Sequence, residues 1–357
     1  MLKQNSQYDI IAAVPDSTDL LPPPWRAVSL QNRNTLALRS EAAVLRVFTS
    51  TEQVAALGPH VAQGARGWVL GGGSNLVLPA SVPGEVWQMA LRGITLEGET
   101  REHRLVRAAG GEPWHDFVAA CVANGWSGLE NLALIPGTVG AAPVQNIGAY
   151  GLELAERVHS VEAYEVPARR WRRLDAAECG FAYRDSRFKR AAPGHWVITA
   201  VTFALPRLWQ PRLDYPDLQR WPGLQGATPT PAAVFEAVCS IRTGKLPDPA
   251  RLPNAGSFFK NPVVPAVQAA ALSEHHPGMP AWPQAGGNVK LAAAWLIEQA
   301  GWKGRRLGPV GMHERHALVL VNHGDATGAD VLRLAGAVQD DVLADFGVTL
   351  EIEPVRI

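Results

Sequence analysis

The chain has 357 residues, of which 47% are hydrophobic and 18% are charged. This length exceeds one ordinary compact core, and this composition is not that of a disordered chain, so we expect two or three folded units. Lys plus Arg (33) balance Asp plus Glu (33). The chain therefore has no net positive charge that would attract nucleic acid or an anionic membrane. A negatively charged ligand must instead be bound by basic residues placed at its site.

The N-terminus predicts neither a signal peptide nor a membrane anchor, because acidic residues interrupt it and no run of 18 apolar residues occurs in the chain. The cysteines are far apart and form no Cys-x-x-Cys pair; they are Cys121, Cys179 and Cys239. This spacing favours buried thiols in a reducing compartment and gives no metal site. We therefore expect a cytoplasmic protein without membrane insertion and without a bound metal.

The first part of the chain predicts short strands after an irregular start. Residues 1–28 end in a proline-rich stretch, which favours an irregular N-terminal extension. Two strands are then expected over residues 43–48 and 67–70, with a helix between them that Thr51 is placed to cap. The second strand leads into a run of three glycines, followed by Ser, Asn and a short apolar run at 76–78.

From residue 86 to residue 206 strand-like runs predominate, which predicts an α+β unit. The expected strands are 86–91, 105–109, 158–166 and 196–205, and the one expected helix is 114–124. Prolines are frequent between 206 and 231, and because proline interrupts both strands and helices this stretch is the expected domain boundary.

The last part of the chain has helical spacing in three places, residues 231–246, 290–300 and 328–345. Strands are expected at 317–321 and 348–353. Strict alternation over 348–353 places Glu351 and Glu353 on the face opposite the apolar residues.

The glycine run at 71–73 allows a tight turn and a close approach to a ligand, and its amides can face a pyrophosphate. An ordinary turn between strands is the alternative interpretation. No Gly-x-Gly-x-x-Gly or phosphate-loop lysine motif accompanies it, so a Rossmann or P-loop protein is not expected.

Residues 128–151 alternate small, apolar and amide side chains with almost no charge. Such a segment suits a flat, mostly neutral ring that backbone and amide groups contact. A buried connection between sheets is the alternative.

These two segments resemble the flavin-contacting stretches of UDP-N-acetylenolpyruvoylglucosamine reductases, which belong to the vanillyl-alcohol-oxidase-like FAD superfamily. The resemblance continues, in the family's order from about Asn34 to the C-terminus, through residues 181–189, 243–249, 254–262 and 351–354. It implies an α+β fold in which a two-part FAD-binding module of the vanillyl-alcohol-oxidase (PCMH) type precedes an α+β substrate-binding domain. The implied boundaries are 29–85 and 86–210 for the two FAD-binding subdomains and 211–357 for the substrate-binding domain.

The resemblance also implies the activity, which is NADPH-dependent reduction of UDP-N-acetylglucosamine enolpyruvate to UDP-N-acetylmuramate through FAD, in peptidoglycan precursor synthesis. Residues 71–75 contain neither His nor Cys, so we expect FAD to be held non-covalently. The implied cofactor-binding residues are Gly71, Gly72, Gly73, Ser74, Asn75, Leu76, Ile135, Pro136, Gly137, Thr138, Gly140, Ala141, Gln145, Asn146, Gly148 and Tyr150.

Three catalytic residues follow from the same resemblance: Arg184 for the carboxylate, Ser257 as proton donor and Glu353 beside the developing charge. Glu351, on the same predicted strand face, is the rival for the third role. Residues 213–218 resemble a substrate-covering loop of the longer, type I reductases. The implied substrate-binding residues are Tyr183, Tyr215, Lys245 and Asn261.

Two other functions are compatible with parts of this pattern. An FAD-dependent oxidase of the same superfamily, acting on an alcohol or lactone, would share the flavin segments but not the three catalytic residues. A flavin-binding or nucleotide-sugar-binding module would show no turnover. The basic cluster at 169–173 lies between predicted strands, which favours an exposed hairpin over a nucleic-acid site.

Overall fold

The computed structural model describes residues 17–225 and 228–357. Contacts between Cα atoms divide the chain into two compact units. Unit 1 comprises Ala42–Gly72 and Pro83–Arg242 together with the described residues up to Val28, and unit 2 comprises Ser29–Glu41, Gly73–Val82 and Thr243–Ile357. The backbone therefore passes between the units several times before it stays in unit 2.

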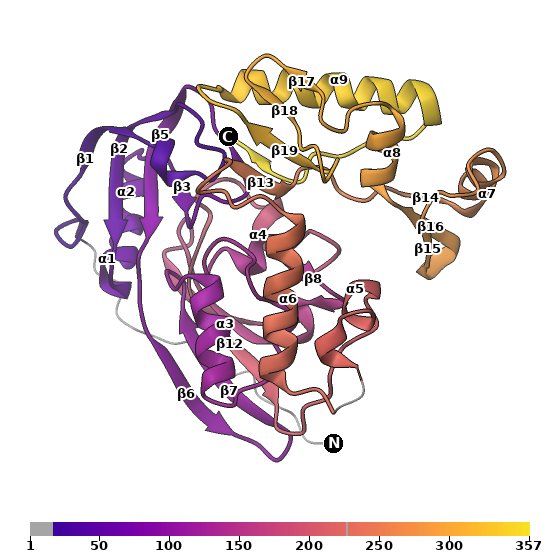
Figure 1. The fold of residues 1–357 in the computed structure, drawn as a ribbon. Helices are drawn as coiled ribbons and strands as arrows, with labels where there is room; N and C mark the ends of the chain where they lie inside the picture. Colours follow the sequence, from indigo (N-terminus) through magenta and orange to yellow (C-terminus); the bar gives the residue numbers. More distant parts are fainter. Residues whose placement is uncertain (1–16, 226–227) are drawn as a thin grey trace. The chain divides into compact units, whose positions relative to one another are not determined.

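Unit 1 combines two larger sheets and the antiparallel pair β8–β9 with several helices (Figure 1). One sheet has the strand order β1-β2-β5-β3, and the other is antiparallel with the order β11-β10-β12-β7-β6. The strands are β1 (Trp25–Ser29), β2 (Glu41–Phe48), β3 (Gly67–Leu70), β5 (Ser81–Met89), β6 (Ile94–Glu99), β7 (His103–Ala109), β8 (Gly148–Ala149), β9 (Leu152–Glu153), β10 (Val158–Glu165), β11 (Arg170–Asp175) and β12 (Trp196–Pro206). The helices are α1 (Thr51–Ala55), α2 (Leu57–Ala62), α3 (Trp114–Ala123), α4 (Arg187–Arg190), α5 (Pro216–Gln219) and α6 (Pro231–Lys245).

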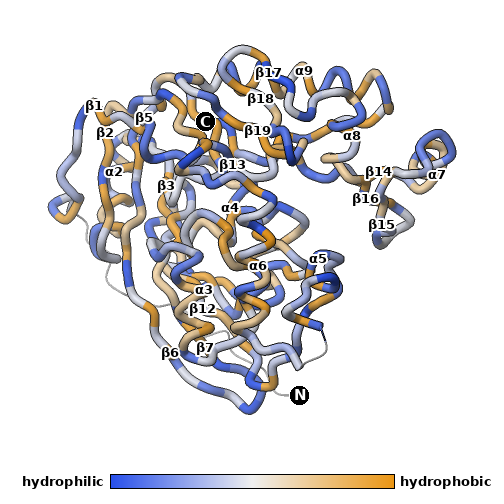
Figure 2. Tube along the Cα trace, in the orientation of Figure 1, coloured by the Kyte–Doolittle hydropathy of each residue, from blue (hydrophilic) through white to orange (hydrophobic). Residues whose placement is uncertain are grey.

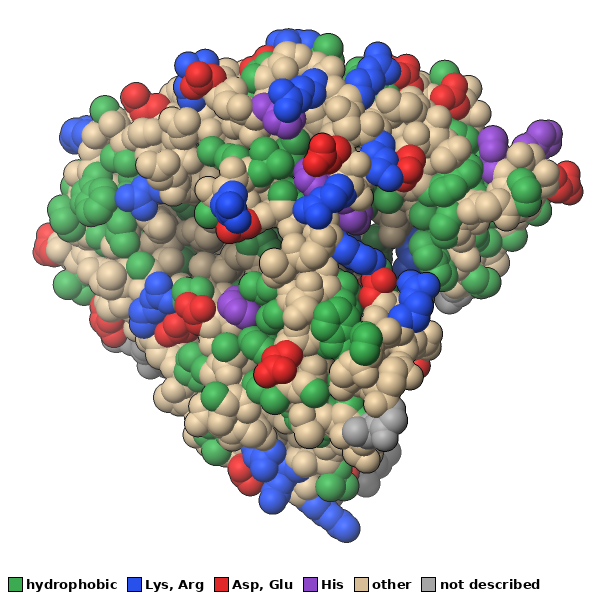
Figure 3. Space-filling view, in the orientation of Figure 1, with side chains coloured by type: hydrophobic (Ala, Val, Ile, Leu, Met, Phe, Trp, Pro, Cys, Tyr) green, Lys and Arg blue, Asp and Glu red, His purple; other side chains and the backbone are tan. Residues whose placement is uncertain are grey.

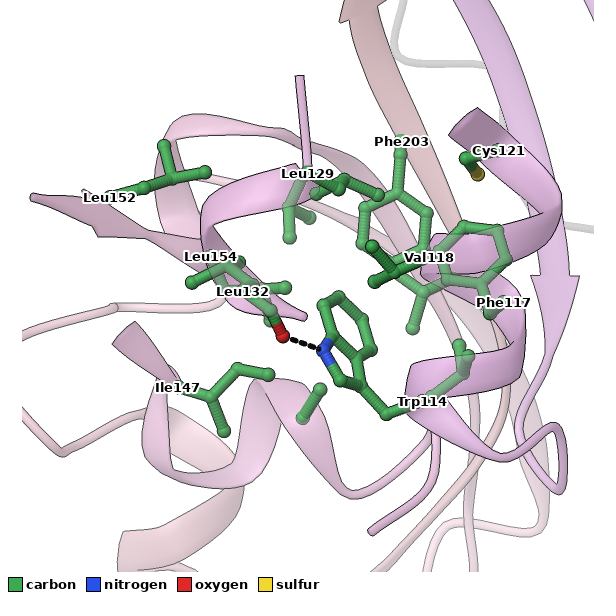
Figure 4. Packing of buried hydrophobic residues seen from close by; sticks show 14 of the residues in the cluster. Trp114, Phe117, Val118, Cys121, Leu129, Leu132, Ile147, Leu152, Leu154 and Phe203 are labelled. Carbon is green, nitrogen blue, oxygen red and sulfur yellow. Dashed lines mark hydrogen bonds between the residues drawn. The ribbon is translucent and has the colours of Figure 1, made fainter. Parts of the chain in front are cut away.

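The main core of unit 1 lies between its antiparallel sheet and the helices α3 and α6, which are drawn in front of β7 and β12 in Figure 1. The strand β12 is almost continuously apolar and buried, as a central strand covered on both faces requires. Figure 2 shows the contrast with the hydrophilic turn between β6 and β7. Figure 4 shows Trp114 inside this core, where its indole N–H donates to the carbonyl oxygen of Leu132 at 2.8 Å.

Unit 2 contains a four-stranded sheet, β13-β19-β18-β17, a three-stranded sheet, β14-β16-β15, and the parallel pair β20-β4. Its strands are β4 (Leu76–Val77), β13 (Asn254–Ser257), β14 (Val263–Pro265), β15 (Ala281–Gln284), β16 (Asn288–Leu291), β17 (Arg306–Leu307), β18 (Val310–Met312), β19 (Val319–Asn322) and β20 (Val355–Arg356). Its helices are α7 (Ala266–His275), α8 (Ala293–Gln299) and α9 (Gly328–Phe346).

The helix α9 illustrates how the sequence sets its own limits. Thr327 caps its N-terminus in a capping box with Asp330, and Gly347 ends it in the left-handed conformation. Its predicted apolar stripe is buried in the core of unit 2; the stripe consists of Val331, Leu334, Ala335, Val338 and Val342.

Most predicted elements are confirmed, and the differences have local causes. The cap of α1 is Ser50, whose hydroxyl accepts from the N–H of Gln53, and Thr51 is already inside the helix. Of the helix predicted at 290–300, the first residues belong to the strand β16, which pairs with β14 and β15. Within the predicted extension 1–28, residues 1–16 lie outside the described part, and Trp25–Ser29 forms the edge strand β1.

The strand predicted at 348–353 is an extended segment with a single bridge, between Ile352 and Phe259. Alternation holds as far as Glu351, which is exposed, but Glu353 is buried with 9% of its surface exposed. The two glutamates therefore differ in burial, and their predicted common face stays a prediction. The N–H of Glu353 donates to the carbonyl of Phe258 at 2.9 Å, which brings Glu353 beside another segment of unit 2.

The packing units differ from the boundaries that we predicted. The helix α6 belongs to unit 1 because its apolar residues enter the same core as α3; these are Val234, Ala237, Val238 and Ile241. The short segment before Ala42 belongs to unit 2, where the side-chain amide of Asn322 donates to the carbonyl of Leu36 at 2.8 Å.

On the face drawn in Figure 3, basic and acidic side chains are interspersed, and no large patch of a single charge is seen. The predicted basic hairpin β10–β11 is confirmed, and its arginines form ion pairs with Glu165, Glu178 and Glu97. Among the helices of the described residues, none combines the length and the apolar character needed to span a bilayer.

The buried indole of Trp114 gives a test of the unit 1 core. Trp114→Phe removes the bond to Leu132 and leaves a small cavity, so it should lower the free energy of unfolding by about 1–3 kcal/mol. The control Trp282→Phe, at a residue that is 44% exposed, should change it by less than about 0.5 kcal/mol. Denaturant unfolding followed by circular dichroism measures both, and equal effects would show that the indole bond adds nothing.

Candidate functional site

The two predicted flavin segments meet inside unit 1. A Cβ atom built on Gly71 would lie 2.6 Å from Oγ1 of Thr138, and one built on Gly72 would lie 2.9 Å from Cα of Gly137. Real Cβ atoms do not approach other atoms so closely, so both positions require glycine. The structure therefore places Gly71 and Gly72 directly against residues 137–138 of the second segment.

The hydroxyl of Thr138 has no hydrogen-bond partner although Oγ1 is buried. An unpaired buried hydroxyl costs free energy unless a ligand completes it. Here it lies beside the glycines, where backbone amides can approach an anion and no side chain intervenes. This combination of an orphaned donor and a glycine cradle fits the pyrophosphate of FAD.

Backbone hydrogen bonds hold residues 137–140 of this segment within unit 1. The N–H of Val139 donates to the carbonyl of Glu112 and that of Gly140 to the carbonyl of Gly110, both at 2.9 Å, while Trp114 N–H donates to the carbonyl of Gly137 at 3.0 Å. The segment is thus fixed in position before any cofactor binds.

The side chain of Asn146 is used within the protein. Its amide nitrogen donates to Glu153 (2.9 Å) and to the carbonyl of Ala182 (3.1 Å), and its oxygen accepts from the N–H of Ala155 (2.9 Å). Asn146 therefore shapes the segment by joining three loops.

Gly73 to Leu76, the rest of the predicted pyrophosphate turn, belong to unit 2. Gly73 has a φ of 62°, and a Cβ there would lie 2.0 Å from the carbonyl oxygen of Arg33, so only glycine fits. The carbonyl of Asn75 accepts from the N–H of Val355 at 2.9 Å, next to the pair that Leu76 makes with Val355 in β4–β20.

Arg184 is held by carbonyl groups of the flavin segment. Its guanidinium donates to the carbonyl oxygen of Gly148 at 2.8 Å, and it lies 5.2 Å from the ring centroid of Tyr183. Its own backbone has a φ of 53°, in the left-handed region. The neighbouring Asp185 pairs with Arg190, so adjacency in the sequence does not make Arg184 and Asp185 an ion pair.

Tyr150 and Tyr215 meet edge to face, with ring centroids 5.0 Å apart. The side-chain amide of Asn131 donates to the carbonyls of Tyr150 and of Arg212, both at 2.9 Å, and so joins the loops that carry the two tyrosines. Burial raises the pKa of Tyr150 to about 12 and also raises the pKa of Tyr215. Both phenols are therefore neutral donors at physiological pH.

Ser257 and Glu353 come from neighbouring segments of unit 2. Ser257 ends β13 and is exposed, while the next residue, Phe258, accepts from the N–H of Glu353. The turn before Ser257 depends on Gly256, whose φ is 68°. The structure thus brings two predicted catalytic residues to one place in unit 2.

The rival Glu351 lies elsewhere. Its side chain is 70% exposed and pairs with Lys260, whereas Glu353 is buried. Burial next to the Ser257 segment favours Glu353 as the functional carboxyl group, and an exposed ion pair is ordinary surface structure.

The remaining predicted residues of unit 2 have separate surroundings. Lys245 is exposed at the end of α6, and its charge contributes, after burial, to lowering the pKa of His316. The side-chain oxygen of Asn261 accepts from the N–H of Ala293 at 3.0 Å and so completes the start of α8.

Sequence reasoning missed Arg242 on α6. Its Nε is buried without a partner, and its charge acts on Tyr150. The available signal was spacing, because Arg242 follows the buried Val234 and Val238 at intervals of four and continues their helix face.

Comparison with known sequences identifies the family. The model of the UDP-N-acetylenolpyruvoylglucosamine reductase C-terminal domain matches residues 248–357, and that of an FAD binding domain matches residues 42–167. The UDP-N-acetylenolpyruvoylglucosamine reductase of Bordetella pertussis is 58% identical over 332 residues, which cover 93% of this chain and 95% of that protein. The chain belongs to the UDP-N-acetylenolpyruvoylglucosamine reductase family.

Two further members of this family are also similar to the chain, one in sequence and one in structure. The Paraburkholderia phymatum reductase is 52% identical over 330 residues, 91% of this chain and 95% of that one. The crystal structure of the Thermus caldophilus reductase matches with a TM-score of 0.66 and 26% identity, covering 94% of this chain and 98% of that chain. The predicted α+β class is confirmed, and the match to an FAD binding domain lies ahead of the match to the C-terminal domain in the chain.

The two matched regions contain different groups of the predicted residues. The FAD binding domain includes the glycine turn and the 135–151 segment, and the C-terminal domain includes Ser257, Asn261 and Glu353. Arg184 and Tyr215 fall between the two, in the part that the reductase relatives cover but neither domain model does.

Because the hydroxyl of Thr138 has no partner in the protein, we expect its removal to lower FAD affinity without lowering the stability of the apoprotein. Thr138→Val keeps the shape but removes the donor, so FAD affinity should fall about 10-fold, while the unfolding midpoint of the apoprotein stays unchanged or rises. Fluorescence titration of the apoprotein with FAD, and thermal unfolding, measure the two effects.

Thr202→Val is the matched control, because the buried Thr202 hydroxyl already donates to Glu97 at 3.2 Å. This control should lose stability and keep its FAD affinity. If Thr138→Val behaved like the control, its hydroxyl would be structural.

Proposed function

We infer that this reductase uses NADPH to reduce the enolpyruvyl double bond of UDP-N-acetylglucosamine enolpyruvate, giving UDP-N-acetylmuramate for peptidoglycan synthesis. The observation that carries this inference is the match to curated reductases at 58% identity over 93% of the chain. The oxidase alternative is not favoured, because the reductase C-terminal domain matches residues 248–357. We place the reaction in the cytoplasm.

When bound, FAD accepts hydride from NADPH and passes it to the substrate. We propose that Gly71, Gly72 and Thr138 hold its pyrophosphate and that the 135–150 backbone contacts its ring, because these groups form the prepared surface described above. The proposed division into FAD-binding subdomains 29–85 and 86–210 and a substrate-binding region 211–357 is a statement about function, and the packing units cross it.

Arg184 is the proposed partner of the substrate carboxylate. A guanidinium presents paired donors that match a carboxylate, and one edge of Arg184 is already oriented by the carbonyl of Gly148. As hydride reaches the terminal vinyl carbon, negative charge spreads onto that carboxylate, and Arg184 stabilises it.

Ser257 is the proposed proton donor to the carbon beside the carboxylate. Its exposed hydroxyl at the end of β13 can reach a ligand, and the left-handed turn at Gly256 fixes its position. Glu353 is the proposed neighbour of the developing charge, where a protonated carboxyl group donates a hydrogen bond and a free carboxylate would repel.

Four polar residues are the proposed contacts to the rest of the substrate. Tyr183 and Tyr215 offer phenol donors, Lys245 a positive charge for the diphosphate, and Asn261 an amide for the sugar or uracil. Tyr215 is 42% exposed, as a residue on a covering loop must be.

The direct test of this function separates its two halves under anaerobic conditions. NADPH should bleach the bound flavin, and UDP-N-acetylglucosamine enolpyruvate should restore its colour without oxygen. Restoration by oxygen alone would support an oxidase, and absence of bleaching would exclude NADPH as the donor.

The buried Glu353 predicts a graded mutational response. Glu353→Ala should lower turnover by at least ~10²-fold, the usual loss for a group that stabilises transition-state charge, and Glu353→Gln should lose less because its amide still donates. Glu351→Ala breaks only an exposed pair and should change turnover less than about threefold. Steady-state assays decide, and a damaging Glu351→Ala beside a harmless Glu353→Ala would reverse the two assignments.

The proposed role of Ser257 predicts that its loss slows only one of the two half-reactions. Flavin reduction by NADPH needs no proton at the substrate carbon, so Ser257→Ala should leave it near normal while slowing reoxidation by the substrate by ~10²-fold or more. Substrate affinity should change little, because the hydroxyl acts mainly in the transition state. Rapid-mixing absorbance follows each half, and equal slowing of both would make Ser257 a structural residue.

A further inference from the structure

The start of the 135–151 segment is a short exposed turn, Ile135–Pro136, which we call the tip. Ile135 is half-buried and Pro136 is exposed, so a ligand can reach both. The residues on either side have positive φ angles, 56° at Leu134 and 123° at Gly137. Glycine adopts such angles freely, but at a leucine they cost free energy because Cβ crowds the following carbonyl oxygen. The shape of the tip therefore depends on contacts that hold Leu134.

The first turn of helix α3 holds the backbone on both sides of the tip. Before the tip, the backbone N–H of Leu134 donates to Nδ1 of His115 at 3.1 Å. After the tip, the backbone N–H of Trp114 donates to the carbonyl of Gly137 at 3.0 Å. The indole N–H of Trp114 also donates to the carbonyl of Leu132, as Figure 4 shows. Two successive residues of one helix thus fix the turn.

The ring of His115 is itself held in place. It stacks on Phe235 of α6, with ring centroids 5.5 Å apart and the two planes 8° from parallel. The preceding residue, Trp114, is buried in the core of unit 1, which fixes the backbone at this point of the helix. Because Nδ1 accepts, the neutral ring carries its hydrogen on Nε2. His115 therefore presents an oriented acceptor to Leu134.

The bond between Leu134 and His115 supports a turn and belongs to no helix or sheet ladder. A residue in an uncommon backbone conformation persists only where its surroundings hold it, and such residues gather at ligand sites. A site that binds a rigid ring also needs its contacting groups held in position by the residues behind them. The place of His115, directly behind the tip, fits this supporting role.

We propose that His115 is a positioning residue for the flavin. Through Nδ1 it holds Leu134 in the left-handed conformation, and it thereby fixes the tip against the ring system of FAD. This proposal rests on the proposed function, in which the 135–150 backbone contacts that ring. His115 acts through Leu134 and needs no contact of its own with FAD or substrate.

Three variants test the acceptor atom, by fluorescence titration of the apoprotein with FAD. His115→Leu removes the acceptor and should weaken FAD binding about 10-fold, the effect of losing one hydrogen bond. His115→Gln places its amide near the position of Nε2 and should be equally weak. His115→Asn places Oδ1 near the position of Nδ1 and should stay within about threefold of the wild type.

Titration with FMN shows which part of the cofactor is affected. FMN has the same ring system as FAD, so His115→Leu should weaken both cofactors by the same factor. The visible absorption maximum of the bound flavin should also shift in His115→Leu and return in His115→Asn. A loss confined to FAD would place the effect at the pyrophosphate and would overturn the proposal.

Two controls separate positioning from stability. Thr202→Val, in the same unit, should lower the unfolding midpoint of the apoprotein and keep both cofactor affinities. His275→Leu removes an exposed imidazole whose Nδ1 bonds to the carbonyl of Ala271 within α7, and it should change neither property. The proposal would be overturned if His115→Leu behaved like Thr202→Val, or if His115→Asn were as weak as His115→Leu. If His115→Leu did not fold, the comparison of His115→Asn with His115→Gln would decide.

Failure of the proposed function would look different. In that case the wild-type holoenzyme itself would fail to be bleached by NADPH or to be reoxidised by the enolpyruvyl substrate, whatever residue stands at 115.

Discussion

Contact between two stretches of backbone, Gly71–Gly72 and Gly137–Thr138, sets the geometry of the flavin site. Any side chain at the first two positions would push the stretches apart. Beside this contact the buried hydroxyl of Thr138 has no hydrogen-bond partner. An unsatisfied buried donor costs about 1–3 kcal/mol, so the protein holds a binding surface that FAD would complete, and the arrangement of the surrounding loops depends on this contact.

Buried polar groups of this reductase fall into two classes. Those of the first class have hydrogen-bond partners within the protein, and those of the second class have none. Glu85 is of the first class: burial alone would raise its pKa, but hydrogen bonds from Trp87 and Arg46 outweigh burial and lower it. That carboxylate is fully used within unit 1. The second class consists of buried groups without a hydrogen-bond partner. Thr138 and Arg242 belong to it, because Oγ1 of Thr138 and Nε of Arg242 are buried and have no partner among the described residues. For Thr138, which lies beside the glycine turn, a bound ligand would supply the missing partner.

Local patterns in the sequence predicted most strands and helices, and the resemblance to the family singled out two segments that lie against each other in the structure. What they missed depends on distant pairing. The alternation over 348–353 placed Glu353 opposite the apolar residues, but it gave no sign that Glu353 would be buried beside Phe258, to whose carbonyl its N–H donates. The position of residues 29–41 in unit 2 depends on bonds such as that from Asn322 to Leu36, which have no local signature. Sequence reasoning did not single out Arg242, and tertiary structure shows that its Nε is enclosed.

The central claim is that the glycine turn and Thr138 form a pyrophosphate cradle, and the affinity of the apoprotein for FAD relative to FMN tests it most directly. The flavin rings of the two cofactors are identical, so the comparison isolates the part of the ligand beyond the first phosphate. The account predicts that acid treatment of the yellow protein releases FAD and that the apoprotein binds FAD at least ~10-fold more tightly than FMN, the equivalent of one charge-assisted hydrogen bond. Equal affinities, or release of FMN, would contradict it.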